Sequence, residues 1–446
     1  MSFNQTAQQP IFALASRFLL AASQLLVIFF ASHALTQIEQ GVFSTMRSMV
    51  AMTAIFDLGL SVVLVQVVAH IRATDPESEQ TRAKLRATLR FASLWYCAAT
   101  SVSTIVILWS GWHLLLGAHE LSPISYVLPW LCICASTGLT MLINPLQAFV
   151  EGSGKVISIA LMRGAQAFIG ALALGVVAYL GGGLWSLAAM SVASMLTGWL
   201  WIVLRHHHDF AVIFNAPSKM TVAWRTEIFP FQWRMAISWM CGWIIYQLYV
   251  PVLFAHQGPI LAGQMGLTME ACAGITSLGM AWVGIKAPAW GRLVARGEHR
   301  ELDRQYRIAT RNALVAVVAS TAVFTGGLLA LRAYNHPLAD RFLPTPALLP
   351  LLGAAILNQS VFAMATYLRA HKREPYLAPT VVGAVTLGTW TLVAGPLVGA
   401  TGLAYAHLVV TLIVGWAWGS LIFRHCRTTW HNESAPKAVL SDSTHD

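Results

Sequence analysis

The chain has 446 residues, of which 57% are hydrophobic and only 10% are charged, and its mean hydropathy is +0.62. A soluble domain carries about 25% charged residues, so this composition excludes an ordinary soluble protein and indicates one embedded in a bilayer. The net charge of +10 comes from basic residues spread over several loops. Because these residues do not gather on one face, we expect no nucleic-acid partner.

Apolar runs of about 20 residues recur along the chain, each long enough to cross ~30 Å of hydrocarbon as a helix. They lack the alternation of barrel strands, so helices are the expected spanning elements. The expected fold is therefore all-α: a polytopic membrane protein of about 12 transmembrane helices in two six-helix bundles related by a pseudo-two-fold axis. In chain order the predicted spans are 11–30, 42–70, 89–109, 124–144, 156–180, 184–204, 229–255, 260–288, 312–331, 347–368, 376–396 and 402–423.

Basic residues set the expected orientation. With both termini in the cytoplasm, the segments on that side hold 22 of the 28 lysines and arginines. Anionic lipid headgroups are the expected partners of these charges. We predict an N-terminal bundle over 1–210, a C-terminal bundle over 211–430, and a polar, disordered cytoplasmic tail over 431–446.

The two halves of the sequence resemble each other. At an offset of 223 residues, seven identities fall within thirty positions: the Thr-Met pair at 45–46 meets Thr-Met at 268–269, and Arg47 meets Glu270. Parallel repeats of this kind typify transporters that bind substrate at the repeat interface near the midplane. The repeat predicts that Arg47 and Glu270 face each other across the axis.

Charged residues inside the spans are the main functional signal. An ionised side chain at mid-bilayer costs about 2.5–3.5 kcal/mol, so it usually faces an aqueous cavity or a partner. At a rise of ~1.5 Å per residue, three arginines lie about 8–10 Å inside the cytoplasmic edge of the membrane, namely Arg17, Arg163 and Arg234. We expect this inner region to be cationic, with no acid at equal depth. The in-span residues are Arg17, Arg47, Arg163, Arg234, Asp57 and Glu270.

Each of these residues has two interpretations. Arg17, Arg163 and Arg234 either extend to the lipid headgroups or form a site for an anionic headgroup, since a guanidinium group suits phosphate oxygens. Together with Arg47 they are the candidate substrate-binding residues, and we expect Arg17, Arg47 and Arg234 to line one central cleft. Arg47 and Glu270 form either a structural ion pair or a gate.

Two acids are candidates for ion coupling. Asp57, in the segment FDLGL, either binds a coupling H⁺ or Na⁺ or bridges helices, and Glu270 has the same alternatives.

No metal spacing is apparent, and we expect no cofactor. The run His206-His207-His208-Asp209 is interpreted as a solvated patch in a loop rather than a metal site. Pro251 is expected to kink the seventh span.

Several segments resemble the multidrug/oligosaccharidyl-lipid/polysaccharide exporter superfamily, and within it the polysaccharide and O-antigen flippase branch. The segments that carry the resemblance are GVFSTMRSMVAMTAIFDLGLSVVLVQVVA (41–69), QAFVEGSGK (147–155), PFQWRMAISW (230–239), QGPILAGQMGLTM (257–269) and YLRAHKREP (367–375).

The resemblance implies a V-shaped transporter in a bacterial inner membrane, and not an enzyme. Its substrate would be an undecaprenyl-diphosphate-linked glycan for O-antigen, capsule or exopolysaccharide synthesis, and polysaccharide assembly proteins would be its partners. The resemblance also implies that Arg17 contacts the diphosphate. A cation-coupled multidrug exporter of the same superfamily is the nearest alternative, although arginines outnumber acids within the spans.

Other classes fit the sequence less well. A major-facilitator transporter would carry a glycine–aspartate–arginine turn between the second and third spans, where this chain has RATDPESEQTRAKLR. A membrane glycan polymerase or ligase would need a sizeable outer loop with catalytic residues, whereas the predicted outer loops are short. A non-transporting scaffold would have its cavity residues packed shut.

Overall fold

The computed structural model describes residues 3–74, 78–115, 123–214, 224, 228–371 and 373–433, and several side chains in these ranges, including that of Arg17, lie outside the description. Every regular element among the described residues is a helix. The helices are α1 (Phe3–Ala34), α2 (Gln37–Val50), α3 (Thr53–Asp57), α4 (Leu60–Thr74), α5 (Glu79–Leu115), α6 (Pro123–Gly152), α7 (Val156–Tyr179), α8 (Trp185–Phe214), α10 (Phe229–Gln247), α11 (Tyr249–Gln257), α12 (Pro259–Arg296), α13 (His299–Ala333), η1 (Pro337–Arg341), α14 (Thr345–Ala370), α15 (Leu377–Val393), α16 (Gly395–Val410), η2 (Thr411–Trp418) and α17 (Gly419–Glu433).

Each predicted span falls on one helix or on one run of consecutive helices. The run α2–α3–α4 covers the second predicted span, α10–α11 the seventh, and α16–η2–α17 the twelfth. Among the described residues, seven helices are long and apolar enough to cross a membrane, and two bent pairs also qualify when each pair is counted as one span. The predicted all-helical, polytopic membrane fold is confirmed, while the domain boundaries stay predictions.

Several helices extend beyond the apolar runs that predicted them. Glu151, expected in a loop, lies in the last turn of α6; His206, also expected in a loop, lies within α8. His431, expected in the disordered tail, lies within α17. These predictions were wrong because hydropathy marks only the part of a helix that lies in hydrocarbon, and polar turns can continue a helix beyond it.

The second predicted span is broken rather than continuous. Leu58 has a φ of 50° and Gly59 a φ of 68°, which ends α3 at Asp57 and contributes to a 42° bend before α4. A left-handed conformation costs a non-glycine residue such as Leu58 roughly 1–2 kcal/mol. A Cβ on Gly59 would lie 2.3 Å from the Cβ of Met235 on α10, so only glycine allows this close approach.

The seventh span bends by 41° between α10 and α11, where Pro251 was expected to kink it. Pro251 has no amide to donate to the carbonyl of Gln247, four residues earlier. The hydroxyl of Ser48 on α2 donates to that carbonyl instead. The bend in the C-terminal half is therefore stabilised by a hydrogen bond from the N-terminal half.

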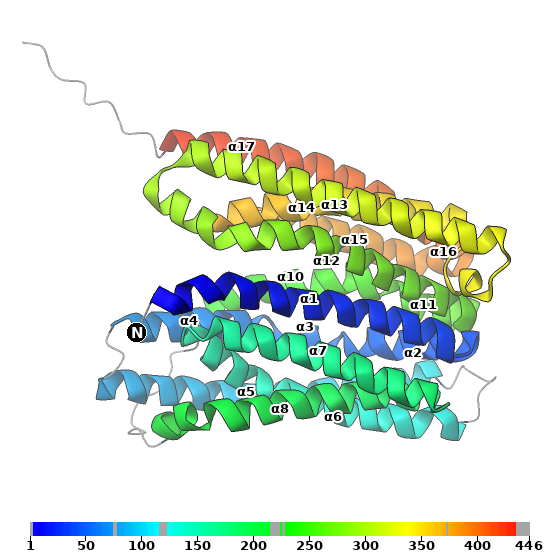
Figure 1. Cartoon of the computed structure of the whole chain (residues 1–446), viewed down its shortest axis with the longest axis horizontal. Coiled ribbons are helices and arrows are strands. Elements are labelled where there is room, and N and C mark those ends of the chain that lie inside the picture. Colours follow the sequence, from blue (N-terminus) through cyan, green and yellow to red (C-terminus); the bar gives the residue numbers. More distant parts are fainter. Residues whose placement is uncertain are drawn as a thin grey trace, which may run out of the picture.

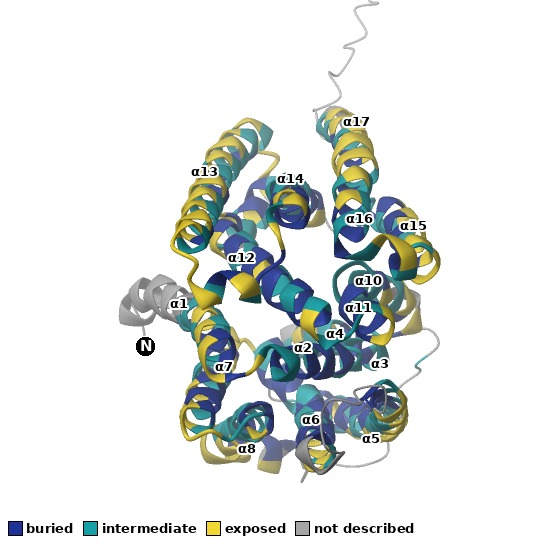
Figure 2. Ribbon diagram, turned by 90° about the vertical axis from the view of Figure 1, so that its right-hand side faces the viewer, coloured by how far each residue is buried: buried dark blue, intermediate teal, exposed yellow. Residues whose placement is uncertain are grey.

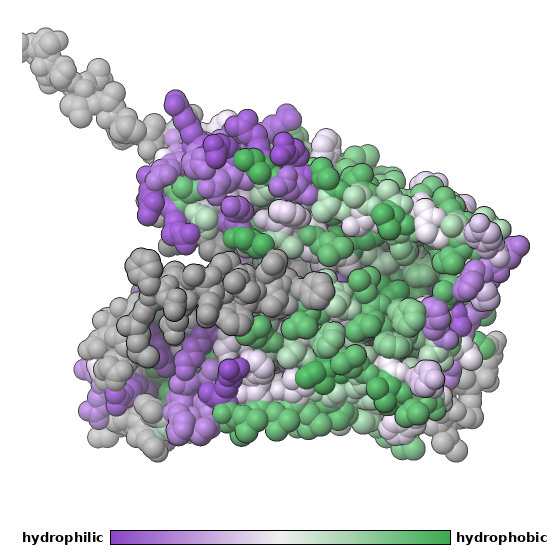
Figure 3. Space-filling model, in the orientation of Figure 1, coloured by the Kyte–Doolittle hydropathy of each residue, from purple (hydrophilic) through white to green (hydrophobic). Residues whose placement is uncertain are grey.

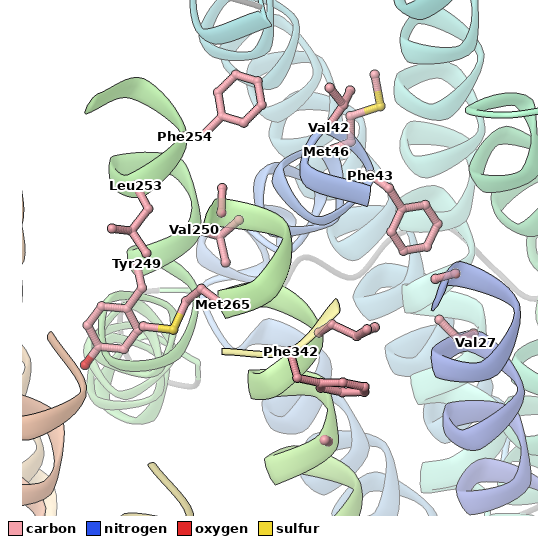
Figure 4. Close-up of a cluster of buried hydrophobic side chains, with 14 of the residues drawn as sticks. Val27, Val42, Phe43, Met46, Tyr249, Val250, Leu253, Phe254, Met265 and Phe342 are labelled. Carbon is pink, nitrogen blue, oxygen red and sulfur yellow. The ribbon is translucent and has the colours of Figure 1, made fainter. Parts of the chain in front are cut away.

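A continuous apolar core lies where the two halves of the chain meet. Residues from α1, α2, α11 and α12 and from the segment after η1 form this core (Figure 4). The α2 helix begins in a capping box, in which Thr36 and Glu39 exchange hydrogen bonds. Labelled members of the core are Val27, Val42, Phe43, Met46, Tyr249, Val250, Leu253, Phe254, Met265 and Phe342.

The helices lie roughly parallel, with α1 beginning and α17 ending at the same end of the molecule (Figure 1). We call this the α17 end, and the opposite end, which carries η1, the η1 end. Polar residues gather at both ends, and apolar residues cover the band between them (Figure 3). Seen end-on, α2, α11 and α12 lie near the middle, whereas α5, α8, α13 and α15 turn exposed faces outward (Figure 2). These exposed apolar faces are suited to contact lipid.

Candidate functional site

A cavity of about 250 Å³ lies between the two halves, and we call it the central cavity. Most of its wall is apolar, and Arg47, Glu270, Asn358 and His407 are among its polar groups. The lining residues include Val27 of α1; Phe43, Ser44 and Arg47 of α2; Tyr246 and Gln247 of α10; Val250 of α11; Leu267, Met269, Glu270 and Thr276 of α12; Leu351, Asn358 and Phe362 of α14; and His407 of α16. The cavity is thus amphiphilic.

Arg47 and Glu270 form an ion pair across this cavity, with Nη2 of Arg47 2.9 Å from Oε1 of Glu270. Their side chains are 29% and 27% exposed, so the pair is mostly withdrawn from solvent. The second terminal nitrogen of Arg47, Nη1, is buried and has no hydrogen-bond partner among the described residues. Buried donors are nearly always paired in folded proteins. Because Arg47 lines the cavity and has a donor to spare, this residue is a candidate ligand contact.

The ion pair sits beside an unusually close helix contact. A Cβ on Gly41 of α2 would lie 2.0 Å from the carbonyl oxygen of Pro259 of α12. A Cβ on Gly263 would lie 2.8 Å from the backbone nitrogen of Gly41, and one on Gly266 would lie 2.4 Å from the Cβ of Ser44. Small residues allow helix backbones in a membrane to approach in this way. The spacing brings Arg47 and Glu270 within contact distance.

Further hydrogen bonds join the halves near the same interface. Gln40 of α2 donates to the carbonyl of Arg341, and Arg341 donates back to the Gln40 side chain. Ser277 of α12 donates to the side chain of Gln24 of α1 at 3.2 Å. Together with the bond between Ser48 and Gln247, these contacts join the halves around the central cavity.

His407 is a polar residue of the central cavity that the sequence analysis did not identify. Its Nδ1 lies 2.8 Å from the hydroxyl of Tyr249, and the ring packs edge-on against Tyr246. The repeat gives no signal for it, because a histidine in an apolar span more often satisfies a local hydrogen bond than binds a ligand. In this structure it bonds to Tyr249 and also borders the cavity.

A second cavity, of about 720 Å³, lies mainly within the N-terminal half and is named here the N-half cavity. Asp57 reaches it from the end of α3, with its side chain buried. Tyr96 of α5 donates to Oδ1 of Asp57, and Ser61 donates to Oδ2 at 2.8 Å. The cavity wall is rich in polar groups, which include Thr53, Asp57, Ser61, Gln66, Thr137, Thr140, Asn144, Gln147, Glu151, Arg163, Ser191 and Ser194.

Arg163 lines this N-half cavity and not the central one. Its Nη2 lies 2.9 Å from Oε2 of Glu151, with side chains 50% and 21% exposed. The expectation that no acid neutralises the inner arginines is therefore wrong for Arg163. The error arose because Glu151 was placed in a loop, whereas α6 continues through Gly152 and carries Glu151 to the neighbouring α7.

The remaining two arginines, Arg17 and Arg234, are not seen at either cavity. The side chain of Arg17 lies outside the described residues, although its backbone belongs to α1. Arg234 is exposed on α10, with its guanidinium carbon 5.5 Å from the ring centre of Trp233, and it is absent from the lining of both cavities described above. Of the three residues expected in one central cleft, only Arg47 is seen there.

Comparisons with known proteins give matches in structure only. No protein-family model matches the chain, and no curated protein matches its sequence. An inward-facing multidrug resistance transporter of the MATE family, in the MOP superfamily, matches with a TM-score of 0.66 and 16% identity, over 94% of this chain and 99% of that one. The lipid II flippase MurJ in an inward closed conformation matches with a TM-score of 0.59 and 13% identity, over 95% and 90% of the two chains.

A third match is a MOP superfamily transporter from Pyrococcus furiosus, described as having a binding pocket of reversed polarity, with a TM-score of 0.54, 11% identity and 94% of each chain covered. The chain has the fold of these transporters. At such low identities the likeness shows the fold alone, so substrate and branch depend on the residues of this chain.

Proposed function

We propose that the chain is a flippase that moves a lipid-diphosphate-linked oligosaccharide across the bacterial inner membrane for polysaccharide synthesis. The observation that carries the proposal is the guanidinium group of Arg47, which has a buried, unpaired donor at the wall of an otherwise mainly apolar cavity. An amphiphilic cavity of this kind suits a substrate with an anionic head and an apolar tail.

The size of the central cavity supports transport by alternating access. Ligand pockets usually measure about 300–1,000 Å³, and the cavity of about 250 Å³ is too small for a glycan. The halves must therefore separate to admit the substrate. Arg47 and Glu270 lie on opposite sides of the parting surface, so we propose that their ion pair is a gate that exchanges Glu270 for a phosphate group.

Arg17 and Arg234 keep their proposed roles at the cytoplasmic approach to the cavity. In this proposal both termini face the cytoplasm, and both arginines bind the diphosphate before it reaches Arg47. Replacing either residue with Gln is expected to abolish surface glycan export while the protein level stays unchanged. Lysine at the same positions is expected to rescue export only partly, because it cannot bind phosphate through two parallel hydrogen bonds. Normal export by the double Gln variant would remove this role.

One observation favours a second candidate function, cation-coupled multidrug export. Asp57 is a buried carboxylate whose side-chain donors, Tyr96 and Ser61, are hydroxyl groups, and it borders the polar N-half cavity. A carboxylate in such a place can bind H⁺ or Na⁺. The same Asp57 can also couple a flippase to an ion gradient, so this site does not by itself identify the substrate.

A transport assay separates the two candidates. The full chain is reconstituted in liposomes with a fluorescent undecaprenyl-diphosphate oligosaccharide, and the label in each leaflet is measured with an impermeant quencher. Flipping that falls at least about tenfold in Arg47→Gln, equivalent to about 1.4 kcal/mol, supports the flippase. Gradient-driven uptake of a cationic dye, with no movement of the lipid-linked glycan, would assign the chain to drug export instead.

A further inference from the structure

Three histidines meet at the α17 end of the C-terminal half, away from both cavities. His299 is the first residue of α13, His371 follows the last residue of α14, and His431 lies in the last turn of α17. One ring nitrogen of each can be chosen so that the three atoms lie within 4.8 Å of one another. The helices α13 and α17 lie on either side of α14 (Figure 2), so the cluster connects two helices across a third.

The cluster has nitrogen atoms that no protein group uses. Both ring nitrogens of His299 and the Nε2 of His371 are buried without a hydrogen-bond partner among the described residues. The rings of His299 and His431 are stacked, with centres 4.3 Å apart, and His371 packs against Trp430 with ring centres 5.0 Å apart. Unpaired buried nitrogens are costly, and here His299 and His371 each place at least one of them in a cluster whose ligand atoms lie within 4.8 Å of one another.

Hydrogen bonds to one nitrogen of His371 and of His431 leave the other nitrogen of each ring with a free lone pair. Nδ1 of His371 lies 3.3 Å from the carbonyl oxygen of Tyr367, to which it can only donate, so its Nε2 is the bare nitrogen. The hydroxyl of Tyr367 donates to Asp303 at 2.8 Å and is 2.9 Å from Nε2 of His431. His431 therefore donates from Nε2, and its Nδ1 is bare.

This pattern is that of metal-binding histidines, which usually donate their second ring nitrogen to a carbonyl or carboxylate group. Here the carbonyl of Tyr367 orients His371, and the carboxylate of Asp303 orients His431 through the hydroxyl of Tyr367. Asp303 is in turn held by Arg427, which donates to both of its oxygens.

We propose that His299, His371 and His431 bind one transition-metal ion of the Zn²⁺ class. Zinc binds histidine nitrogen at about 2.0–2.1 Å, which in a tetrahedron separates the nitrogens by ~3.3 Å, so small side-chain rotations bring the three together. Three histidines leave a fourth position for water. Ni²⁺, Cu²⁺ and Co²⁺ also favour imidazole, so the site is assigned to this group of ions rather than to Ca²⁺ or Mg²⁺.

The bound ion would fix the C-terminal helix α17 to α13 at the α17 end. This inference differs from the expectation that the chain binds no metal. It had no signal in the sequence, because the three histidines stand far apart there and none belongs to a short metal-binding motif. The site is independent of the proposed function, since none of its residues lines either cavity.

Metal titration of the full chain tests the proposal. The protein is purified in detergent with an affinity tag that contains no histidine, and Zn²⁺ binding is measured by calorimetry. We expect one ion per chain with a dissociation constant below about 1 µM. Co²⁺ should give the visible absorption bands of a four-coordinate nitrogen site, and Zn²⁺ should raise the Tm of the protein.

Variants show whether these histidines hold the ion. His371→Asn and His431→Asn should each weaken Zn²⁺ binding at least about 100-fold, and Tyr367→Phe about 10- to 100-fold, because it removes the group that orients His431. The matched control is His207→Asn with His208→Asn, in the other histidine run, which should bind Zn²⁺ like the unaltered chain. Circular dichroism of each variant without metal shows whether its helices remain.

Three results would overturn the proposal. The first is the absence of stoichiometric Zn²⁺, Co²⁺ or Ni²⁺ binding by the unaltered chain. The second is undiminished binding, with the same Co²⁺ spectrum, when all three histidines are replaced by Asn. The third is a loss of binding in the control alone. If binding disappears only in the control with both His207 and His208 replaced, the ion is bound at α8 and the assignment to α13, α14 and α17 is wrong.

Discussion

Two arginines of the predicted spans, Arg47 and Arg163, form pairs with glutamates, and these pairs differ in what they connect. Arg47 and Glu270 join α2 to α12, which belong to different halves of the chain, whereas Arg163 and Glu151 join the neighbouring helices α7 and α6 of one half. The nitrogen–oxygen distance is 2.9 Å in both pairs. If the halves part as proposed, only the first pair must break. Whether an ion pair crosses the boundary between the halves, rather than its length, therefore decides whether it would respond to such a movement.

The largest effect is expected where the backbones of α2 and α12 touch. Gly41→Ala places a Cβ 2.0 Å from the carbonyl oxygen of Pro259, and since this atom belongs to the backbone, the helices must move apart. We expect a loss of about 1–3 kcal/mol in stability and a lower Tm, with transport strongly reduced.

The control for this change is Gly326→Ala in α13, where an added Cβ meets nothing within 4 Å. It should leave the Tm unchanged or raise it slightly, because alanine favours helix more than glycine does. An equal loss of stability in both variants would show that the close contact between α2 and α12 does not cause the effect of Gly41→Ala.

The next largest effect concerns the pair that joins the halves. Arg47→Gln leaves Glu270 without its partner, and we expect transport to fall at least about tenfold, with a loss of roughly 1–2 kcal/mol in stability. Arg47→Glu combined with Glu270→Arg should restore the stability lost in either single variant. A double-mutant cycle with no coupling energy would contradict the claim that this ion pair stabilises the contact between the halves.

Asp57→Asn tests the N-half cavity. The amide has nearly the same shape but cannot carry a negative charge, so we expect transport to lose its dependence on a proton or sodium gradient while the protein level is retained. Transport is measured in liposomes with and without each gradient. Tyr96→Phe removes one hydrogen bond to the same carboxylate and should cost about 1–3 kcal/mol in stability without removing the gradient dependence. If transport by Asp57→Asn still depended fully on the gradient, Asp57 would be excluded as the residue that binds the coupling ion.

The smallest effect is expected for Arg163→Gln. Half of its side chain is exposed, so solvent screens its pair with Glu151. Such pairs contribute about 0–1 kcal/mol, and we expect the Tm to change little. Transport should also stay within about twofold of normal, since this pair does not cross the boundary between the halves. A loss as large as that of Arg47→Gln would remove the distinction between the two pairs.

Much of the fold follows from the sequence, because hydropathy marks the spans and the repeat aligns Arg47 with Glu270. The central ion pair has the geometry that the repeat predicts, while its role as a gate stays a prediction. The break at Leu58 and Gly59 was missed, since a left-handed leucine depends on packing against α10 that no local pattern encodes.

Residues far apart in the chain were the hardest to predict. His299, His371 and His431 come together only through the packing of α13 and α17 on either side of α14. Glu151 was missed for a different reason: the apolar run that predicted the span ends at residue 144, but α6 continues through Gly152. Local composition could not show how far the helix reaches.

The bond from Ser48 to the carbonyl of Gln247 makes the bend at Pro251 sensitive to the position of the opposite half. If α2 moved away, this carbonyl would be left unpaired in an apolar setting, at a cost of about 1–3 kcal/mol unless water reached it. In the proposed transport cycle, hydration of this single peptide group would therefore be part of the free-energy cost of separating the halves.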